Sequence, residues 1–274
     1  MAESDGTHTP QNRAPSEGTG DFRARLDAKT WREIVDVVST LLTEAHFILS
    51  ESGLTLCQLD SSKAAMIDLN LPAGVFQEYT CKGEHIVCLA VEDLVRIAKR
   101  MNKGDKVEIA LNAATQRFEI HIKGKHMERQ FRLMLLSPPE SRRDSKSIGH
   151  EVLVEMDTSA FRQAVQDIGV VAGHIKMEAV EGSLTLIGEG GFGDAMVVLR
   201  TGDESPLYNI QVARPTTATY SLSYLTEMVR ALPSEALRLK FATDRPIQLE
   251  SVLADGGNLR FVLAPRVSRV PEGY

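Results

Sequence analysis

The second half of the chain repeats the order of elements of the first half, at an offset of about 130 residues. FRARLDAKTWREIVDVVSTLL (22–42) is echoed by VLVEMDTSAFRQAVQDIGVVA (152–172), with Asp157 in the place of Asp27 and Phe161 in the place of Trp31. LTL at 54–56 returns at 184–186, VEDLVRIAKRM (91–101) returns as LSYLTEMVRAL (222–232), and RQFRLMLL (129–136) returns as NLRFVLAP (258–265). Four elements in one order at one offset predict a duplicated domain, with a period far longer than that of a solenoid repeat. The chain must therefore fold as two similar units.

Each half has the pattern of several short strands and two amphipathic helices, which is typical of the α+β class. The helix after Asp27 places Trp31, Ile34, Val35 and Val38 on one side, the spacing of a stripe that faces a core. A second helix is predicted over about 91–102, and strands over 22–26, 85–90, 107–111, 117–123 and 128–136. We therefore expect antiparallel sheets covered by helices.

The stretch 52–71 predicts a hairpin, because two runs of alternating apolar and polar residues flank turn residues at 60–62. Small residues, Ala64 and Ala65, follow this turn and lie beside the large apolar Leu59 and Met66. Small side chains next to large ones could form the floor of a pocket. This hairpin is the first candidate for a binding surface.

Composition divides the chain into five segments. Residues 1–20 are rich in Gly, Pro, Ser and Thr, so we expect a disordered extension. Residues 21–136 and 152–268 are the two predicted domains, and 137–151, which carries two prolines and many charges, is the predicted linker between them. Residues 269–274 are expected to form a C-terminal tail.

Composition also excludes several classes of function. No apolar run approaches the roughly 20 residues that span a bilayer, and the N-terminus carries no apolar signal region, so we expect a soluble intracellular protein without membrane partners. The three cysteines lack the spacing of metal ligands, so neither a metal site nor a cofactor is expected. A formal net charge of −6 argues against binding of nucleic acid by bulk charge, although it leaves room for a local basic surface.

The most enzyme-like motif is the glycine-rich run Gly188 to Gly193. Such a loop can hold phosphate where it joins a strand to a helix, but AMVVL at 195–199 predicts a following strand. We interpret the run as a hairpin turn that needs positive φ. With no other catalytic pattern present, no catalytic residues are predicted, and an enzyme using this loop is the alternative from another class.

Basic residues recur on the polar faces of the predicted helices. Arg96, Lys99, Arg100 and Lys103 have the spacing of a single helix face, and Arg230 is their counterpart in the second half. Arg32 and Arg162 begin the polar faces of the two longer helices. A solvated face of mixed charge is the simpler interpretation. Contacts to nucleic acid from such a face would go to phosphate, so they would depend on salt and not on sequence.

The chain resembles the sliding clamps of the proliferating cell nuclear antigen (PCNA) family from Phe22 to about Val267. The motifs that carry the resemblance are GLTLCQLDSSKAAMIDL (53–69), LMLL (133–136), DRPIQLE (244–250) and LRFVLAPR (259–266). The hairpin LDSS and the late LAP are specific when they occur together. The internal duplication is also the architecture of this family.

The resemblance implies the clamp fold and a non-enzymatic homotrimeric ring that encircles double-stranded DNA without regard to sequence. The helices would line the hole, and the family's partners would be DNA polymerase, flap endonuclease, DNA ligase and the clamp loader, replication factor C. The implied DNA-facing residues are Arg32, Arg96, Lys99, Arg100, Lys103, Arg162 and Arg230.

The resemblance also implies a peptide pocket and a subunit contact. The pocket residues carried over are Leu59, Ala64, Met66, Met134, Leu136, Pro246, Val262, Ala264 and Pro265. The subunit contact is expected between edge strands, through Met127, Arg129 and Phe131 on one subunit and Ala195, Val197 and Leu199 on the next.

The linker departs from the family pattern, because it reads SPPESRRDSKS where relatives commonly carry further apolar residues. Acidic sequences flanking a partner's anchors would then be favoured. The linker and the lack of a basic localisation run favour a chromosome-associated protein of an archaeal-type cytoplasm, with the nucleus as its place in a eukaryote. A subunit of a heterotrimeric or checkpoint-type clamp is the nearest alternative.

Overall fold

The computed structural model describes residues 21–112, 115–139, 145–254 and 256–266. The expected extension (1–20) and tail (269–274) lie outside these residues, as does the middle of the linker. The first half contains β1 (Phe22–Asp27), α1 (Ala28–Ser39), β2 (Glu44–Ser50), β3 (Gly53–Leu59), β4 (Ala65–Pro72), η1 (Ala73–Val75), β5 (Glu78–Cys81), β6 (His85–Ala90), α2 (Val91–Ala98), β7 (Lys106–Asn112), β8 (Arg117–Lys123) and β9 (Glu128–Met134). The second half contains β10 (Val152–Asp157), α3 (Thr158–Gly169), β11 (His174–Val180), β12 (Ser183–Gly190), β13 (Gly193–Arg200), β14 (Leu207–Val212), β15 (Thr216–Ser221), α4 (Leu222–Ala231), β16 (Ala236–Phe241), β17 (Ile247–Leu253) and β18 (Gly257–Leu263).

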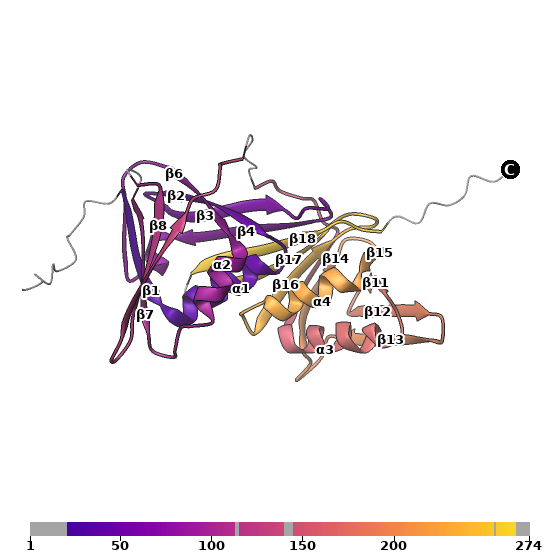
Figure 1. The fold of residues 1–274 in the computed structure, drawn as a ribbon. Coiled ribbons are helices and arrows are strands. Elements are labelled where there is room, and N and C mark those ends of the chain that lie inside the picture. Colours follow the sequence, from indigo (N-terminus) through magenta and orange to yellow (C-terminus); the bar gives the residue numbers. More distant parts are fainter. Residues whose placement is uncertain (1–20, 113–114, 140–144, 255, 267–274) are drawn as a thin grey trace, which may run out of the picture.

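The strands form three antiparallel sheets, and their order repeats between the halves. The first sheet has the order β5-β1-β7-β8-β9, which the second half reproduces as β14-β10-β16-β17-β18. The third sheet, β13-β12-β11-β15, reproduces β4-β3-β2-β6 of the first half in the same way. β4 pairs with β18, so these two segments join into one nine-stranded sheet that runs through both halves (Figure 1). The α+β class and the duplication are thus confirmed.

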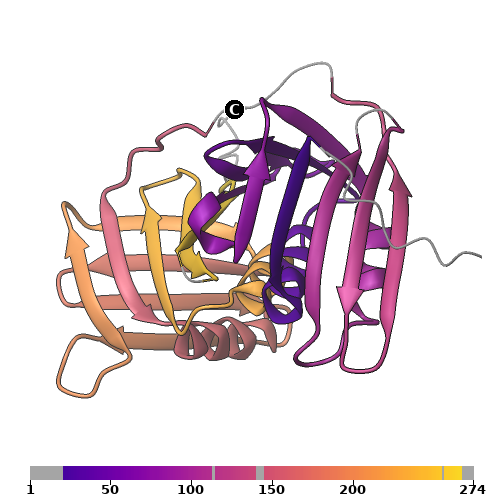
Figure 2. The same ribbon diagram turned by 90° about the vertical axis from the view of Figure 1, so that its left-hand side faces the viewer.

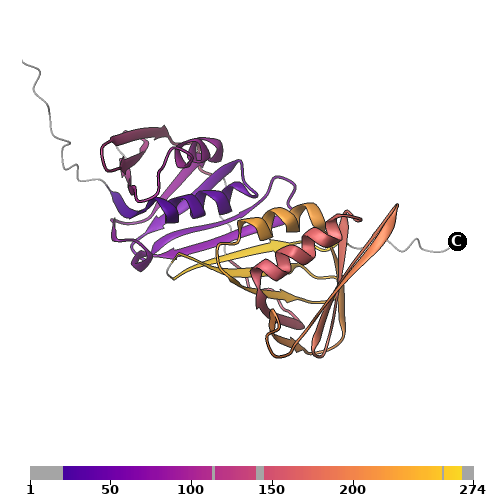
Figure 3. The ribbon, with the colours of Figure 1, turned by 90° about the horizontal axis from the view of Figure 1, so that it is seen from below.

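Within the described residues, helices α1 to α4 lie on one side of the nine-stranded sheet, as the view from below shows (Figure 3). The described parts of the linker, on either side of residues 140–144, lie on the opposite side (Figures 1 and 2). The molecule therefore has a helical face and an outer sheet face.

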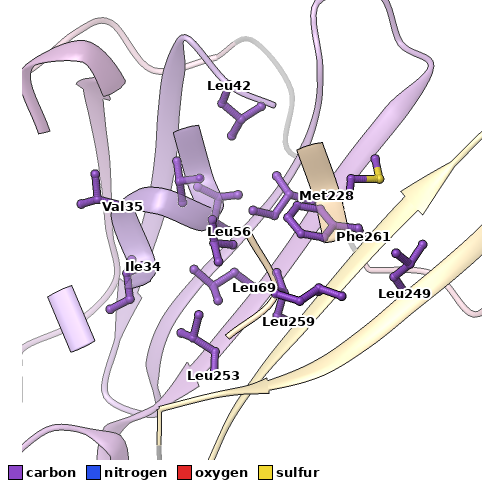
Figure 4. Packing of buried hydrophobic residues seen from close by; sticks show 14 of the residues in the cluster. Ile34, Val35, Leu42, Leu56, Leu69, Met228, Leu249, Leu253, Leu259 and Phe261 are labelled. Atoms are coloured by element: carbon purple, nitrogen blue, oxygen red, sulfur yellow. The ribbon is translucent and has the colours of Figure 1, made fainter. Parts of the chain in front are cut away.

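The core between sheet and helices is continuous from one half to the other. Ile34 and Val35 of α1 pack in the same cluster as Met228 of α4, against Leu69 of β4 and Phe261 of β18 (Figure 4). The stripe predicted on α1 is buried as expected, because each apolar position at helical spacing meets the sheet. Burial of this kind stabilises the fold by roughly 25 cal/mol per Å² of apolar surface.

Two predicted boundaries were too long. The second helix ends at Ala98 instead of Asn102, and β9 ends at Met134 instead of Leu136. After Ala98 the chain turns: the Asp105 carboxylate accepts the amide of Asn102 at 2.9 Å, and Gly104 adopts a φ of +89°. These local hydrogen bonds compete with continuation of the helix.

The glycine-rich run 188–193 is a hairpin turn between β12 and β13, as predicted, but its glycines do not adopt positive φ as predicted. A Cβ on Gly190 would lie 1.7 Å from the carbonyl oxygen of Val171, and one on Gly188 would lie 2.4 Å from Ile168. Close approach of the end of α3 requires glycine here.

Candidate functional site

An apolar patch on the outer face of the nine-stranded sheet contains most of the expected pocket residues. Leu59, Met66 and Val262 lie directly opposite one another on β3, β4 and β18, so their side chains share one face. The amide of Ala264 donates to the carbonyl of Ala64 at 2.8 Å, which joins the chain after β18 to the hairpin turn. We call Leu59, Ala64, Met66, Pro246, Val262, Ala264 and Pro265 the outer patch; Leu59 and Met66 are half-buried, and Ala264 is exposed.

The two remaining pocket residues, Met134 and Leu136, come from the end of β9. The Leu136 amide donates to the carbonyl of Cys88 on β6 at 2.9 Å, and β6 is two strands away from β3 in the sheet. The Met134 side chain is 69% exposed. These residues approach the patch from the side opposite to β18.

The second described part of the linker is fastened to the outer face by a polar cluster. Ser145 donates to the carboxylate of Asp68 at 2.5 Å, and Arg260 contacts both Asp68 and Ser145 at 2.7 Å. Further along, Gln248 donates to the carbonyl of Ile148 at 3.2 Å. Asp68 and Arg260 stand opposite each other on β4 and β18, one step along each strand's outer face from Met66 and Val262. The linker therefore borders the outer patch.

A separate cavity of about 890 Å³ lies on the other side of this polar cluster. Its lining includes Thr55, Asn70 and Asn258, which lie further along β3, β4 and β18, and it contains none of the outer patch residues. Sequence reasoning gave no indication of this cavity, because its lining comes from eight strands of both halves and from the linker.

On the helical face, Arg32 and Arg162 hold the helix pairs together. Arg32 of α1 donates to the carbonyl of Met101 after α2 at 3.3 Å. Arg162 of α3 donates from Nε and one terminal nitrogen to the carbonyl of Val229 in α4, at 3.4 and 3.2 Å. Both side chains are half-buried. Arg32 thus donates to the backbone of the turn that follows α2, and Arg162 donates to the backbone of α4.

The other basic residues of the helical face divide into paired and unpaired groups. Arg96 forms ion pairs with Glu92 and Asp93, and Arg230 pairs with Glu227. Lys99, Arg100 and Lys103 are exposed, and their side chains form no ion pair with any other residue that the structure describes. Because α2 ends at Ala98, these three residues lie in the turn between α2 and β7 and not on a helix face, which corrects the single face predicted for Arg96, Lys99, Arg100 and Lys103.

The turn between β8 and β9 packs against this basic turn. Arg129 of β9 contacts the Asp105 carboxylate and the carbonyl of Arg100, and a Cβ on Gly124 would lie 2.9 Å from Asp105. Lys125 is exposed beside Gly124. Nothing in the sequence indicates that the β8–β9 turn lies next to residues 99–105, because only tertiary contacts bring these segments together. Arg129, predicted as a subunit contact, is bound within its own chain.

The two strands with the expected subunit contacts are both at free edges. β9 ends the five-stranded sheet, and β13 ends the four-stranded sheet. By the duplication, β13 corresponds to β4 and β9 corresponds to β18, and β4 and β18 are the strands that pair within the chain. Phe131, Ala195, Val197 and Leu199 are half-buried against the core, while Met127 and Met196 are 63% and 64% exposed. The two open edges are therefore the duplicates of two strands that pair within the chain.

The described residues contain neither a grouping of metal ligands nor a membrane-spanning helix. No three His, Cys, Asp or Glu side chains within them are grouped so as to hold a metal ion. Among the same residues, no helix has the length and apolar content needed to cross a membrane.

Models of both halves of one protein family match this chain. The model of the N-terminal domain of proliferating cell nuclear antigen matches residues 22–137, and that of the C-terminal domain matches residues 146–266. Among curated relatives, a protein of Pyrococcus abyssi named DNA polymerase sliding clamp is 32% identical over 241 residues, covering 88% of this chain and 96% of the relative. A protein of the same name from Thermofilum pendens is 30% identical over 245 residues, covering 88% and 97%.

Solved structures agree on the fold. The proliferating cell nuclear antigen of Entamoeba histolytica superposes with a TM-score of 0.83 at 17% identity, covering 91% of this chain and all of the other. The PCNA of Thermococcus kodakaraensis gives 0.83 at 22% identity, covering 89% of this chain. Because the family models match both halves and the relatives span nearly the whole chain, this chain belongs to the proliferating cell nuclear antigen family.

Proposed function

We propose that this protein is a DNA sliding clamp: a ring of three identical subunits that encircles duplex DNA and tethers DNA polymerase to it. One observation carries the proposal. The edge strands β9 and β13 are the duplicates of β18 and β4, and β18 and β4 pair with each other inside the chain. A head-to-tail contact between these edges repeats an existing junction, and such contacts make a ring when the rotation closes. The helical face, with Lys99, Arg100 and Lys103, would then surround the DNA.

The internal junction also supplies a register for the subunit contact. The repeated LTL motif makes Leu54 of β3 the counterpart of Leu184 of β12. Leu54 stands opposite Leu71 and Leu184 stands opposite Leu199, so Leu71 of β4 is the counterpart of Leu199 of β13. By the same correspondence, Phe131 is the counterpart of Phe261. Transferring the β4–β18 register places Asp194 opposite Arg132 of the neighbouring subunit and Ala195 opposite its Phe131. An ion pair and an apolar contact would thus form at each junction.

Tethering is assigned to the outer patch, on the face opposite the helices. An aliphatic and two aromatic anchors of a partner peptide would each gain roughly 1.5–3 kcal/mol on burial, which is enough for a micromolar complex after the costs of association. The same patch would serve flap endonuclease, DNA ligase and the clamp loader in turn. The protein would act as a chromosome-associated scaffold in an archaeal-type cytoplasm, without catalysis of its own.

The proposal is tested by topological retention on DNA. The protein is allowed to thread onto linear duplex with biotinylated ends, and streptavidin then blocks both ends before a high-salt wash. We expect protein to stay on blocked DNA and to leave when one end is cut free, because an encircling ring is held by topology and not by charge. Equal loss from blocked and open DNA would contradict encirclement.

The unpaired basic turn makes a second prediction, on the salt dependence of DNA binding. Lys99→Ala and Arg100→Ala should each weaken binding to DNA of any sequence and lower the slope of log K against log salt by about 0.9 for each phosphate that is no longer neutralised. Lys82→Ala is the matched control, since Lys82 is an exposed lysine between β5 and β6 and is not one of the implied DNA-facing residues. Binding measured by fluorescence anisotropy across a salt series checks this. Equal slopes for the variants and the unmodified protein would exclude the turn from the DNA-binding surface.

A further inference from the structure

The turn between β3 and β4, at the edge of the outer patch, is organised around one carboxylate. Asp60 is only 7% exposed. Its Oδ1 accepts the amide of Ala65 at 2.8 Å, and its Oδ2 accepts the amide and hydroxyl of Ser62 at 3.3 and 2.5 Å. Lys63 adopts a φ of +59°, a conformation that non-glycine residues rarely take, and its amide donates to the carbonyl of Asp60 at 3.0 Å. The turn therefore keeps its shape only while Asp60 is satisfied.

The last partner of this carboxylate comes from the other half of the chain. The hydroxyl of Tyr224, in the first turns of α4, donates to Asp60 Oδ2 at 2.7 Å and lies 2.7 Å from Ser62 Oγ. Burial by itself raises the pKa of Asp60, but the hydrogen bonds from Ser62, Ala65 and Tyr224 outweigh burial and hold this pKa below its ordinary value. The carboxylate is thus ionised and fully engaged at neutral pH.

A second tyrosine of the same region holds the opposite border of the patch. Tyr220, at the end of β15, is completely buried, and its hydroxyl donates to the carbonyl of Arg245 at 2.8 Å. Arg245 directly precedes Pro246, and its amide donates to the carbonyl of Ala242 at 3.1 Å. The segment that carries Pro246 is therefore fixed to the strand that leads into α4.

We propose that the hydroxyls of Tyr220 and Tyr224 are positioning groups for partner binding: they hold the two borders of the outer patch, the hairpin turn and the Pro246 segment, in the shape that receives a peptide. This inference rests on the proposed function of the patch. A surface that is already ordered spends less of its binding free energy on ordering, so pre-organisation appears as affinity. Helix α4, on the helical face, thereby helps to shape the site on the outer face.

The test compares Tyr224→Phe and Tyr220→Phe with the unmodified ring in binding a synthetic peptide with one aliphatic and two aromatic anchors on a single turn. Each variant removes one oxygen and no apolar contact, and we expect the Kd of the peptide to rise roughly 5- to 20-fold. Tyr208→Phe is the matched control, because Tyr208 is exposed and its hydroxyl lies 3.5 Å from Asp157, away from the patch.

Two further measurements separate positioning from a general loss of stability. Amide hydrogen exchange in Tyr224→Phe should accelerate at Ser62 and Ala65 and stay unchanged along the ladders of β3 and β4. A double-mutant cycle with Asp60→Asn should show coupling, since the second change adds little once the hydrogen bond to Tyr224 is lost. Exchange that rises across the whole sheet, or additive effects in the cycle, would overturn positioning.

The outcomes distinguish this inference from the proposed function. Failure of the unmodified ring to bind the peptide overturns the assignment of the patch and the inference with it. If the unmodified ring binds the peptide and both Tyr220→Phe and Tyr224→Phe bind it with the same Kd, the inference about the tyrosines is overturned and the proposed function is not.

Discussion

Leu59→Glu is expected to eliminate binding of an anchor-bearing peptide, with a loss of affinity of at least about 100-fold. Leu59 is half-buried and lies in one row with Met66 and Val262 on the outer face. The change removes roughly 1.5–3 kcal/mol of apolar contact and leaves a carboxylate that would be buried without a partner, which costs several kcal/mol more. Calorimetric titration with the peptide measures the effect. Pro246→Glu should act in the same way.

The matched control is Asn70→Glu. Asn70 is exposed on the same face of β4, and it lines the separate cavity instead of the outer patch. Asn70→Glu adds the same charge to β4, the strand that pairs with β3, so peptide binding should change little, and the native mass of both variants should equal that of the unmodified ring. If Leu59→Glu bound the peptide as tightly as Asn70→Glu, the outer patch would not be the tethering site.

Val198→Pro is expected to convert the ring to monomers at concentrations where the unmodified chain is trimeric. The amide of Thr201 donates to the carbonyl of Gly182 at 3.0 Å, so by strand alternation the amide of Val198 on β13 points away from β12 to the open edge. Proline removes this donor and places its ring against the facing carbonyl, so each junction loses a ladder hydrogen bond. Light scattering should give three times the 30.1 kDa chain before the change and 30.1 kDa after it.

Val198→Thr serves as the control, because threonine keeps the amide and the β-branched shape, and it should remain trimeric. A charge exchange then examines the register. Asp194→Arg should weaken the ring by placing like charges opposite each other, and adding Arg132→Asp should restore it. If both Val198→Pro and Asp194→Arg kept the native mass of a trimer, the two edges would not meet in the ring. If the unmodified chain and every variant were monomeric, assembly with sister subunits would be favoured.

Local periodicity was enough to predict most elements. The stripe of Trp31, Ile34, Val35 and Val38 predicted α1, and turn residues between alternating runs predicted the β3–β4 hairpin, because both signals arise within a few residues. The position of Asp27 before α1 was also predicted, but its side chain makes no capping bond and instead pairs with Lys106. Its duplicate Asp157 does cap α3, through the amides of Ser159 and Ala160.

The candidate site could be predicted in its composition but not in its geometry. The motif residues named most of the outer patch, since Leu59, Met66 and Val262 lie within recognisable runs. The end of α2 was missed because the Asp105 carboxylate accepts the amide of Asn102, and Asp105 is itself paired with Arg129 from another strand. The sequence likewise contains no sign that the arginines of the helical face have partners. In the structure, Arg32 and Arg162 each donate a hydrogen bond to a backbone carbonyl, 69 and 67 residues away along the chain.

The duplication, the class of each element and the apolar surfaces could all be predicted from the amino-acid sequence, because hydrophobic spacing is set by residues within one or two turns of the chain. Three features became known from the folded chain: which strand edges stay open, why Gly188 and Gly190 must lack side chains, and the hydrogen bond from Tyr224 to Asp60 across 164 residues. These features depend on backbone and polar groups that come into contact only after folding. Such a contact produces no periodic pattern of residues in either of the two segments that it joins.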